Sequence, residues 1–316
     1  MKIIKYEDKY KTEWDNFIEN SKNGTFLLKR DYMEYHKDRF PDNSYLFFDE
    51  KEKLKAVIPG TIRDNIFYSH RGLTYGGFVL NKDSKTADVF EYFKLLNNEL
   101  KKQGIEKVLY KSIPYIYSSY LSEEDEYVLF RLNAKLISVG ISSTIDLQED
   151  FKFSTLRKRS IKKSNKYNIL LEKDKNYKEF WDILTENLKI SHKTTPVHTL
   201  DEILYLKGKF PENIKLYTAS YEKKIIAGVV VYEEKSTVHI QYISANDFGK
   251  GISALDFIFN YLIKEEFKNK KYFDFGISVE NNGYYLNEGL IFQKEGFGAR
   301  GIVYRQYEYN LGENDV

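Results

Sequence analysis

The residues whose types best fit chemistry gather near the end of the chain, in the stretch DFGISVENNGYYLNEGLIFQKEGFG from Asp274 to Gly298. The stretch combines acids, amides, glycines, aromatic residues and a lysine, and it shows no helical period. Its first residues end an apolar segment typical of a buried strand, and NNG then turns the chain. Loops at strand ends are where rigid scaffolds present functional side chains. We therefore interpret the stretch as a candidate site; a glycine-rich hairpin whose acids face water is the alternative.

Two histidines form a second candidate group. His192 and His198 flank a proline in the segment SHKTTPVHTLDEI, and we predict that they contact substrate. Thr199 and Glu202 match a capping box, which predicts a helix that begins just after Thr199. The histidine spacing does not match common zinc sites and the chain has no cysteine, so no metal site is expected.

The segment FKFSTLRKRSIKKSNKYNILLEKD predicts an amphipathic helix that is crowded with arginine and lysine. Clustered arginine and lysine suit a diphosphate or an RNA backbone. A basic helix that is merely solvated is the alternative interpretation. The residues that we predict to bind an anionic substrate are Arg159, Lys163 and Lys166.

Composition sets the class of protein. With 316 residues, of which 42% are hydrophobic and 30% charged, the chain is globular and long enough for two domains. Its 49 basic and 47 acidic residues nearly balance, so DNA is not an expected partner. The lack of cysteine removes disulfides and thiol nucleophiles. We expect a cytoplasmic protein, because no apolar run is long enough for a membrane helix and the start of the chain lacks the apolar core of a signal peptide.

The elements that must position the candidate residues follow a pattern that occurs twice. In the first half, the strands KLKAVIPGTI and NIFYSHRG precede the helix TADVFEYFKLLNNELKK and the strand KVLYK. In the second half, the strands KKIIAGVVVY and STVHIQYISAN precede the helix SALDFIFNYLIKEEF and the strand YFDFGIS. The spacing between matching segments is nearly constant, which indicates an internal duplication in an α/β fold with mixed sheets. We predict an N-terminal domain at 1–150 and a C-terminal domain at 151–316.

This duplicated organisation resembles the FemAB-like branch of the GNAT (GCN5-related N-acetyltransferase) superfamily. The segment GLIFQKEGFG is similar to the branch's Gly-Leu-x-x-x-Lys-x-Gly-Phe-Gly motif, and the basic segment is similar to a second motif. HKTTPVHTLDEI and DFGISVENNGYYLNEGL also resemble bacterial GNAT-type acyltransferases that are associated with surface polysaccharide synthesis. The resemblance covers nearly the whole chain, and the residues that carry the two motifs are Gly289, Leu290, Lys294, Gly296, Phe297 and Gly298, and Arg159, Ile161, Ser164, Lys166 and Ile169.

The resemblance implies two tandem GNAT-like domains with a cleft between them, and it places Lys294 near the acceptor. The usual GNAT donor loop, Gln/Arg-x-x-Gly-x-Gly/Ala, has an imperfect counterpart in NDFGKGISA, which lacks the first residue type. Backbone N–H groups at a helix start would hold the diphosphate of acyl-CoA, which is then a co-substrate rather than a tightly bound cofactor. The expected donor-binding residues are Gly249, Lys250, Gly251 and Ser253.

Acyl transfer to an amine requires a neutral nucleophile, donors for the developing oxyanion and an acceptor for the proton. Lys294 is a poor base at the ordinary pKa of lysine, so we expect it to act electrostatically on a phosphate or on the oxyanion. We favour Glu280 and His198 as proton acceptors over Asp274, Glu288 and His192. The remaining predicted substrate contacts are His70, Tyr75, Gln241, Tyr242, Ser278, Asn287 and Phe297.

Three functions agree with these features. The first is an acyl-CoA-dependent N-acyltransferase that acts on an amino sugar carried by a nucleotide or lipid diphosphate, in the synthesis of a cell-envelope polysaccharide. The second is a peptidyltransferase that uses aminoacyl-tRNA to extend a cell-wall precursor. The third is a GNAT-fold binding protein without catalytic activity.

Overall fold

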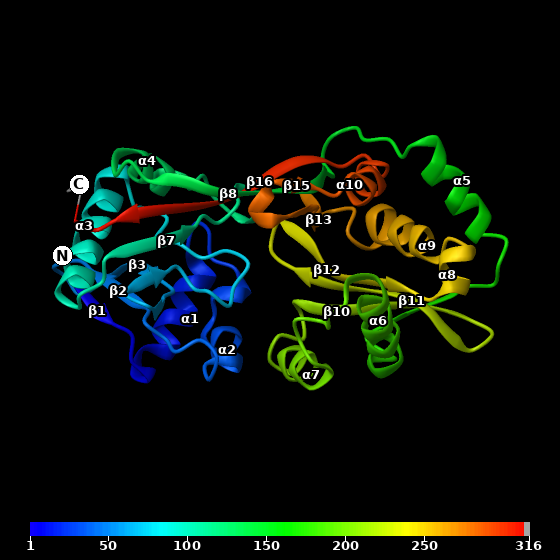
Figure 1. Ribbon diagram of the computed structural model, residues 1–316, viewed down its shortest axis with the longest axis horizontal. Coiled ribbons are helices and arrows are strands. Elements are labelled where there is room, and N and C mark those ends of the chain that lie inside the picture. Colours follow the sequence, from blue (N-terminus) through cyan, green and yellow to red (C-terminus); the bar gives the residue numbers. More distant parts are fainter. Residues whose placement is uncertain (313–316) are drawn as a thin grey trace. The chain divides into compact units, whose positions relative to one another are not determined.

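The computed structural model describes residues 1–312, apart from the side chains of Ser191 and His192. Its internal contacts divide the chain into two units, whose elements are labelled in Figure 1. Unit 1 comprises Met1–Gly140, Val279–Tyr285 and the chain from Val303 onward, and unit 2 comprises Ile141–Ser278 and Leu286–Ile302. Strands β8 (Lys135–Asp146) and β16 (Arg300–Asn310) therefore each contribute residues to both units. The domain boundary near residue 150 stays a prediction.

Unit 1 forms two layers of strands in the described part of the chain. One sheet is antiparallel with the order β1-β2-β3-β6, and the other strands follow the order β4-β5-β7-β16, in which β5 and β7 run parallel. The elements of unit 1, besides β8 and β16, are β1 (Lys2–Lys5), α1 (Lys11–Asn20), α2 (Arg30–Met33), β2 (Tyr45–Phe48), β3 (Leu54–Ile58), β4 (Thr61–Arg63), β5 (Ile66–Tyr68), β6 (Val79–Leu80), α3 (Thr86–Lys102), β7 (Lys107–Lys111), α4 (Glu124–Arg131), β14 (Val279–Glu280) and the first residue of β15 (Tyr285–Leu286).

Helix α3 forms where the sequence pattern predicts it. Its apolar face buries Val89, Phe93, Leu96 and Leu100 in the core of unit 1, at the spacing of successive helical turns. The helix ends just before Gly104, whose φ of 73° lies in the left-handed region that glycine adopts without strain. The chain then turns back into β7, so the crossover delivers β7 parallel to β5.

Unit 2 is built on the strand order β8-β13-β12-β11-β10-β9, in which only β12 and β13 run parallel among the described pairs. Strand β11 carries the apolar run IAGVVV and is buried along most of its length, as expected of a strand covered on both faces. The elements of unit 2 are α5 (Thr155–Ser164), β9 (Leu170–Lys173), α6 (Tyr177–His192), α7 (Leu200–Lys209), β10 (Ile214–Tyr221), β11 (Lys224–Glu233), β12 (Thr237–Ala245), α8 (Asp247–Gly251), α9 (Ala254–Tyr261), β13 (Tyr272–Ile277) and α10 (Glu288–Glu295).

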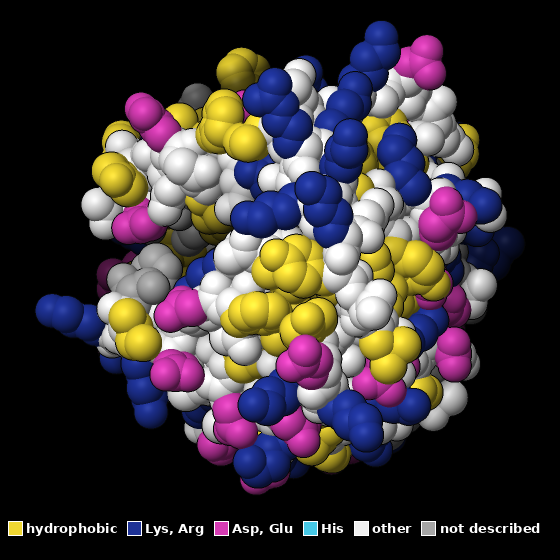
Figure 2. All heavy atoms as spheres, turned by 90° about the vertical axis from the view of Figure 1, so that its right-hand side faces the viewer, with side chains coloured by type: hydrophobic (Ala, Val, Ile, Leu, Met, Phe, Trp, Pro, Cys, Tyr) yellow, Lys and Arg dark blue, Asp and Glu magenta, His cyan; other side chains and the backbone are white. Residues whose placement is uncertain are grey.

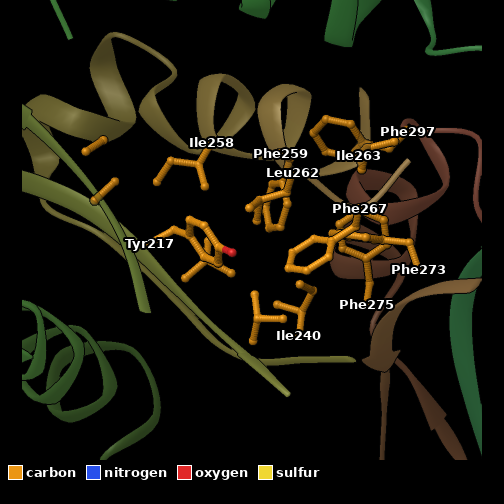
Figure 3. Close-up of a cluster of buried hydrophobic side chains, with 14 of the residues drawn as sticks. Tyr217, Ile240, Ile258, Phe259, Leu262, Ile263, Phe267, Phe273, Phe275 and Phe297 are labelled. Atoms are coloured by element: carbon orange, nitrogen blue, oxygen red, sulfur yellow. The ribbon is translucent and has the colours of Figure 1, made fainter. Parts of the chain in front are cut away.

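Helices cover the two faces of this sheet. Helix α9 packs on β10, β11 and β12 from one face, and α6 packs on β11 and β12 from the other (Figure 1). The core under α9 is rich in phenylalanine, and Figure 3 shows Phe259, Phe275 and Phe297 turned toward one another. The rings of Phe275 and Phe297 stack with centroids 5.6 Å apart, and Phe259 meets Phe275 edge-on at 5.1 Å. Burial of each such side chain stabilises the unit by about 1.5–3 kcal/mol.

Helix α10 was not expected from the sequence. The stretch after NNG was expected to be aperiodic, but Glu288–Glu295 forms helix α10. The side chain of Asn287 accepts a hydrogen bond from the backbone N–H of Leu290 at 3.0 Å and so caps this helix. A helix of about two turns contains too few residues to show a clear 3.6-residue period, which is why the pattern was missed.

Candidate functional site

The sheet of unit 2 opens between its two parallel strands. Strands β12 and β13 pair at Thr237 with Tyr272 and at Val238 with Phe273, and the last pair joins His239 to Asp274. Beyond that pair, β12 continues to Ala245 beside β11 alone, while β13 continues beside β8. The second edge of β12 therefore has no strand beside it from residue 240 onward in the described chain. Its backbone N–H and C=O groups face a wedge into which a ligand can be placed.

A cavity of about 370 Å³ occupies this wedge. Strand β12 forms one wall, helices α8, α9 and α10 form others, and α6 closes the rim. Most lining side chains are apolar, and none of the described lining residues carries a carboxylate. The lining residues are Leu184, Asn187, Leu188, Ile243, Ser244, Ala245, Lys250, Leu255, Phe259, Phe275, Leu290, Gln293, Lys294 and Phe297.

Lys294 is the buried cation of the cavity wall. Its side chain is 5% exposed, and its Nζ donates hydrogen bonds to the carbonyl oxygens of Gly276 at 2.8 Å and Ile277 at 2.9 Å. Burial lowers the pKa of Lys294 to about 8, although the nearby carboxylate of Asp274 acts in the opposite direction. An ammonium has three donors, so the two carbonyl bonds leave one for a ligand.

Asp274 lies behind Lys294 and is completely buried. Its Oδ1 accepts hydrogen bonds from the Ser142 hydroxyl, from the Thr144 hydroxyl at 2.8 Å and from the Gly276 N–H at 3.3 Å. Its Oδ2 lies 2.8 Å from Nδ1 of His239. Burial alone would raise the pKa of Asp274, but the His239 ring and the two hydroxyls outweigh burial and hold that pKa well below its ordinary value. The carboxylate is therefore ionised at neutral pH.

Gly276 joins Lys294 to this buried network. Its φ is 76°, a conformation that glycine adopts without strain. A Cβ added at this position would lie 3.2 Å from Cε1 of His239, so the glycine also lets the imidazole approach the backbone. The same residue donates its N–H to Asp274 and presents its carbonyl to Lys294.

His239 is the residue of this group that the sequence prediction missed. A histidine within a strand gives no local sign of a partner, and Asp274 is far from it along the chain. Only the register of the parallel strands brings the two side chains together. The sole available signal was a titratable residue in the apolar strand STVHIQYISAN.

The predicted donor loop contains the short helix α8. Asn246 caps the short helix α8 by accepting from the Gly249 N–H at 2.8 Å, and Ser253 then precedes α9. A Cβ at Gly249 would come within 2.3 Å of the Ile226 carbonyl oxygen, so packing alone explains this glycine, whereas no atom lies near a Cβ at Gly251. Lys250 lines the cavity, and its Nζ donates to Oδ1 of Asn187 at 3.1 Å.

The predicted basic helix is α5, and its cations are displayed to solvent. Arg159 and Lys163 of α5 and Lys166, just beyond its end, are exposed. Figure 2 shows lysine and arginine side chains gathered on the side of unit 2 that carries α5. None of the three lines the cavity. A neighbour, Arg157, instead pairs with Asp256 of α9 at 2.8 Å, which ties α5 to a cavity helix.

The histidines flanking the proline differ in position. His198 is 3% exposed, its Nδ1 lies 2.6 Å from the hydroxyl of Tyr242, and it is not among the residues that line the cavity. The predicted capping box of Thr199 and Glu202 is present at the start of α7. His192 is the last residue of α6, but its side chain is outside the part that the structure describes. Gln241 lies at the register shift between β11 and β12.

The other predicted contacts occupy different surroundings. Phe297 lines the cavity, Ser278 is buried with no hydrogen-bond partner for its hydroxyl among the described residues, and Glu288 is exposed at the start of α10. Glu280 is exposed in β14 of unit 1. His70 and Tyr75 are buried in unit 1 as well: His70 has φ of 70° and stacks on His36, and Tyr75 packs against Tyr117 and Tyr304.

Comparison with known proteins identifies the fold. No protein-family profile and no curated protein matches the sequence. Among solved structures, FemX is similar with a TM-score of 0.71 at 9% identity over 98% of this chain and 97% of that chain. L-PGS from Bacillus licheniformis is similar with a TM-score of 0.59 at 14% identity over 90% and 93% of the two chains. A tandem GNAT protein from the clavulanic acid biosynthesis pathway gives 0.52 at 8% identity over 99% of each.

These likenesses confirm the predicted fold class. The chain has a mixed α/β fold like those of FemX and the tandem GNAT protein. Within residues 1–312 no helix is long and apolar enough to cross a membrane.

Proposed function

We propose that this chain, with its FemAB-like tandem GNAT fold, is an N-acyltransferase that moves an acyl group from acyl-CoA to an amine. The acceptor is the amine of an amino sugar or of a related precursor of a cell-surface glycan, carried by a nucleotide or lipid diphosphate in the cytoplasm. The wedge between β12 and β13 supports a site for the donor, because its free strand edge can hydrogen-bond the amide groups of the pantetheine arm.

The residues that line the cavity favour one donor over the other. It contains two lysines, Lys250 and Lys294, and no described carboxylate. An aminoacyl donor brings an ammonium group, which would lose water in this cavity without meeting a carboxylate among the described lining residues. An acyl thioester is uncharged and suits the apolar walls. This observation favours acyl-CoA over aminoacyl-tRNA.

Lys250 and Lys294 have different roles in the proposed reaction. Lys250, next to the start of α9, attracts the diphosphate of the donor. Lys294 directs its remaining N–H toward the thioester oxygen and stabilises the oxyanion that forms when the amine attacks. The two carbonyl bonds fix its ammonium in place before the substrate arrives, so little reorganisation is needed.

The first prediction concerns binding and Lys294 together. Acetyl-CoA and CoA should raise the melting temperature of the protein, and charged tRNA should not. Lys294→Ala should abolish acyl transfer to amino-sugar acceptors, measured as release of the CoA thiol, because it removes the oxyanion donor. Transfer should fall by about 100-fold or more. Lys209→Ala, an exposed lysine on α7, is the matched control.

The possible results separate the three functions. A melting shift with charged tRNA alone would indicate the peptidyltransferase, and no shift with either donor would leave a binding protein. Full activity of Lys294→Ala in a protein that binds CoA would remove this lysine from the mechanism. Circular dichroism of the variant establishes that loss of transfer is not loss of the fold.

A further inference from the structure

We propose that His239 is the general base of the transfer and that Asp274 is the residue that positions it. This inference rests on the proposed function and assigns the proton acceptor that the reaction requires. It replaces neither the oxyanion role of Lys294 nor the donor site in the wedge.

The hydrogen bonds of Asp274 determine the state of the imidazole. An ionised carboxylate only accepts hydrogen bonds, so Nδ1 of His239, at 2.8 Å, must carry the proton. In the neutral ring this leaves the lone pair on Nε2. The carboxylate cannot rotate to another partner, because the Ser142 and Thr144 hydroxyls and the Gly276 N–H hold its other oxygen. Asp274 thus fixes both the tautomer and the ring orientation.

His239 is not among the residues that line the cavity, but the glycine beside its ring, Gly276, is hydrogen-bonded to the lining residue Lys294. His239 belongs to the last paired rung before β12 and β13 separate, so it lies at the closed end of the wedge. Its ring edge faces the Cα of Gly276, and the carbonyl of Gly276 accepts the bond from Lys294. The oxyanion donor and the imidazole therefore lie on two sides of a single residue.

Exposure distinguishes the roles of the two members. The Asp274 side chain is 0% exposed, whereas the His239 side chain is 16% exposed. A buried carboxylate behind a partly accessible imidazole is the arrangement that activates a base, because the carboxylate stabilises the imidazolium as it forms. The negative charge is fully desolvated and needs no reorganisation when the ring takes up a proton.

The transfer proceeds by addition of the amine to the thioester and then loss of the thiolate. The neutral amine attacks the thioester carbon, an N–C bond forms, and the carbonyl oxygen becomes an oxyanion beside Lys294. Nε2 of His239 takes the proton from the attacking nitrogen. The C–S bond then breaks, the thiolate of CoA leaves with the bonding pair, and the imidazolium returns the proton to it. The products are an amide and free CoA.

The test compares competing bases in the full chain. His239→Gln should lower kcat by about 100- to 10,000-fold with little change in KM for acyl-CoA, and added imidazole should restore part of the rate. Asp274→Asn should also lower kcat. The amide of Asn can either accept from Nδ1–H of His239 or donate to an unprotonated Nδ1, so it no longer fixes the tautomer. His198→Gln and Glu280→Gln remove the two competing acceptors. Loss of transfer in either of them, with full activity of His239→Gln, would overturn the proposal.

A spectroscopic measurement on the wild-type protein keeps the test independent of how the variants fold. Nitrogen-15 NMR of the histidine rings, with the His239 signals assigned by their absence in His239→Gln, should show that the neutral ring carries its proton on Nδ1. A neutral ring protonated on Nε2 would overturn the proposal even if His239→Gln is inactive. A wild-type protein that neither binds CoA nor transfers an acyl group would overturn the proposed function, and with it the role of His239. Full activity of His239→Gln would overturn the role of His239 alone.

Discussion

Lys111 in unit 1 and Lys294 in unit 2 both donate hydrogen bonds to backbone carbonyls and both have a lowered pKa. Lys111, at the end of β7, donates from Nζ to the Leu73 carbonyl at 2.8 Å and lies within 3.5 Å of the carbonyls of His70 and Arg71. Burial, with Arg71 nearby, lowers the pKa of Lys111 to about 8, and burial lowers that of Lys294 to the same value. Each lysine satisfies backbone carbonyls, and desolvation of its charge is unfavourable.

These lysines predict how stability depends on pH. Below pH 8 both side chains are protonated in the folded and unfolded chain, and burial of the charge destabilises the fold. Between pH 8 and the ordinary lysine value of 10.5, the folded chain has lost these protons while the unfolded chain still binds them. The free energy of unfolding should therefore rise with pH in this window, by about 3 kcal/mol at most for Lys294.

Urea unfolding at several pH values measures this effect. Lys294→Met and Lys111→Met should each remove part of the rise, and the double variant should remove more, because the lysines lie in different units. The difference in the free energy of unfolding between each variant and the wild type reports on the lysine alone. The tyrosines with a raised pKa contribute equally to both proteins. An unchanged slope in both variants would show that the lysines are not charged and buried as described.

At the scale of single residues, the sequence was informative where a motif or a spacing was local. Lys294 and Phe297 lie at the cavity, and Asp274 lies in the network behind it. Their number and type within a short stretch were visible without a structure. His239 was not, because its partner is reached only through the parallel register of β12 and β13. The role of Glu280, His198 and the residues from unit 1 stays a prediction.

At the scale of elements, α5 is a basic surface anchored by one internal pair. Arg157 forms an ion pair with Asp256, whereas Arg159, Lys163 and Lys166 are exposed to solvent. Anion binding by such a surface is electrostatic and weakens with salt. The surface therefore fits the diphosphate of a nucleotide or lipid carrier better than an uncharged amino sugar.

The charge on α5 predicts a kinetic difference. The double variant Arg159→Ala, Lys163→Ala should raise KM for a diphosphate-linked acceptor several-fold at low salt and leave kcat unchanged, because these residues bind the carrier and not the reacting atoms. The double variant Lys178→Ala, Lys189→Ala removes the same charge from exposed positions on α6 and serves as the control. An equal KM for both variants would show that the cations of α5 are only solvated and do not bind the acceptor.

Some elements with a long pattern or a specific capping pair were predicted, although the helix α6 and the strand β8 were not. Helix α3 and the capping box of α7 formed as predicted, since many periodic positions or a specific pair of polar residues supported them. Helices α8 and α10 were missed, because neither is long enough to repeat an apolar period. The open wedge itself follows from where β12 and β13 stop pairing, which depends on tertiary packing rather than on local residue types.

At the scale of the whole molecule, the chain passes between its units more than once. Residues Gln306–Asn310 of β16 pair with Lys107–Lys111 of β7, and Tyr309 and Leu311 belong to the core of unit 1. The hydroxyl of Tyr309 also donates to Asn97 of α3 at 2.9 Å. Unit 1 is thus completed by residues from the far end of the sequence.

This connectivity predicts that a fragment of residues 1–150 does not fold cooperatively. Without β16 the edge of β7 is unpaired, and part of the apolar core is exposed to water. The fragment should show no sharp urea transition, whereas the same fragment joined by a flexible linker to residues 300–312 should regain one. A sharp transition in the short fragment would show that β16 is dispensable for unit 1.

The place of β16 also sets the order of events during synthesis. The ribosome makes β7 well before β16, so unit 1 cannot close its sheet until the chain through β16 has emerged. For that interval β7 offers an open edge to other nascent chains and to chaperones. The speed of translation between β7 and β16 therefore sets how long the edge of β7 stays unpaired. Slow codons in this part of the gene should lower the yield of folded protein.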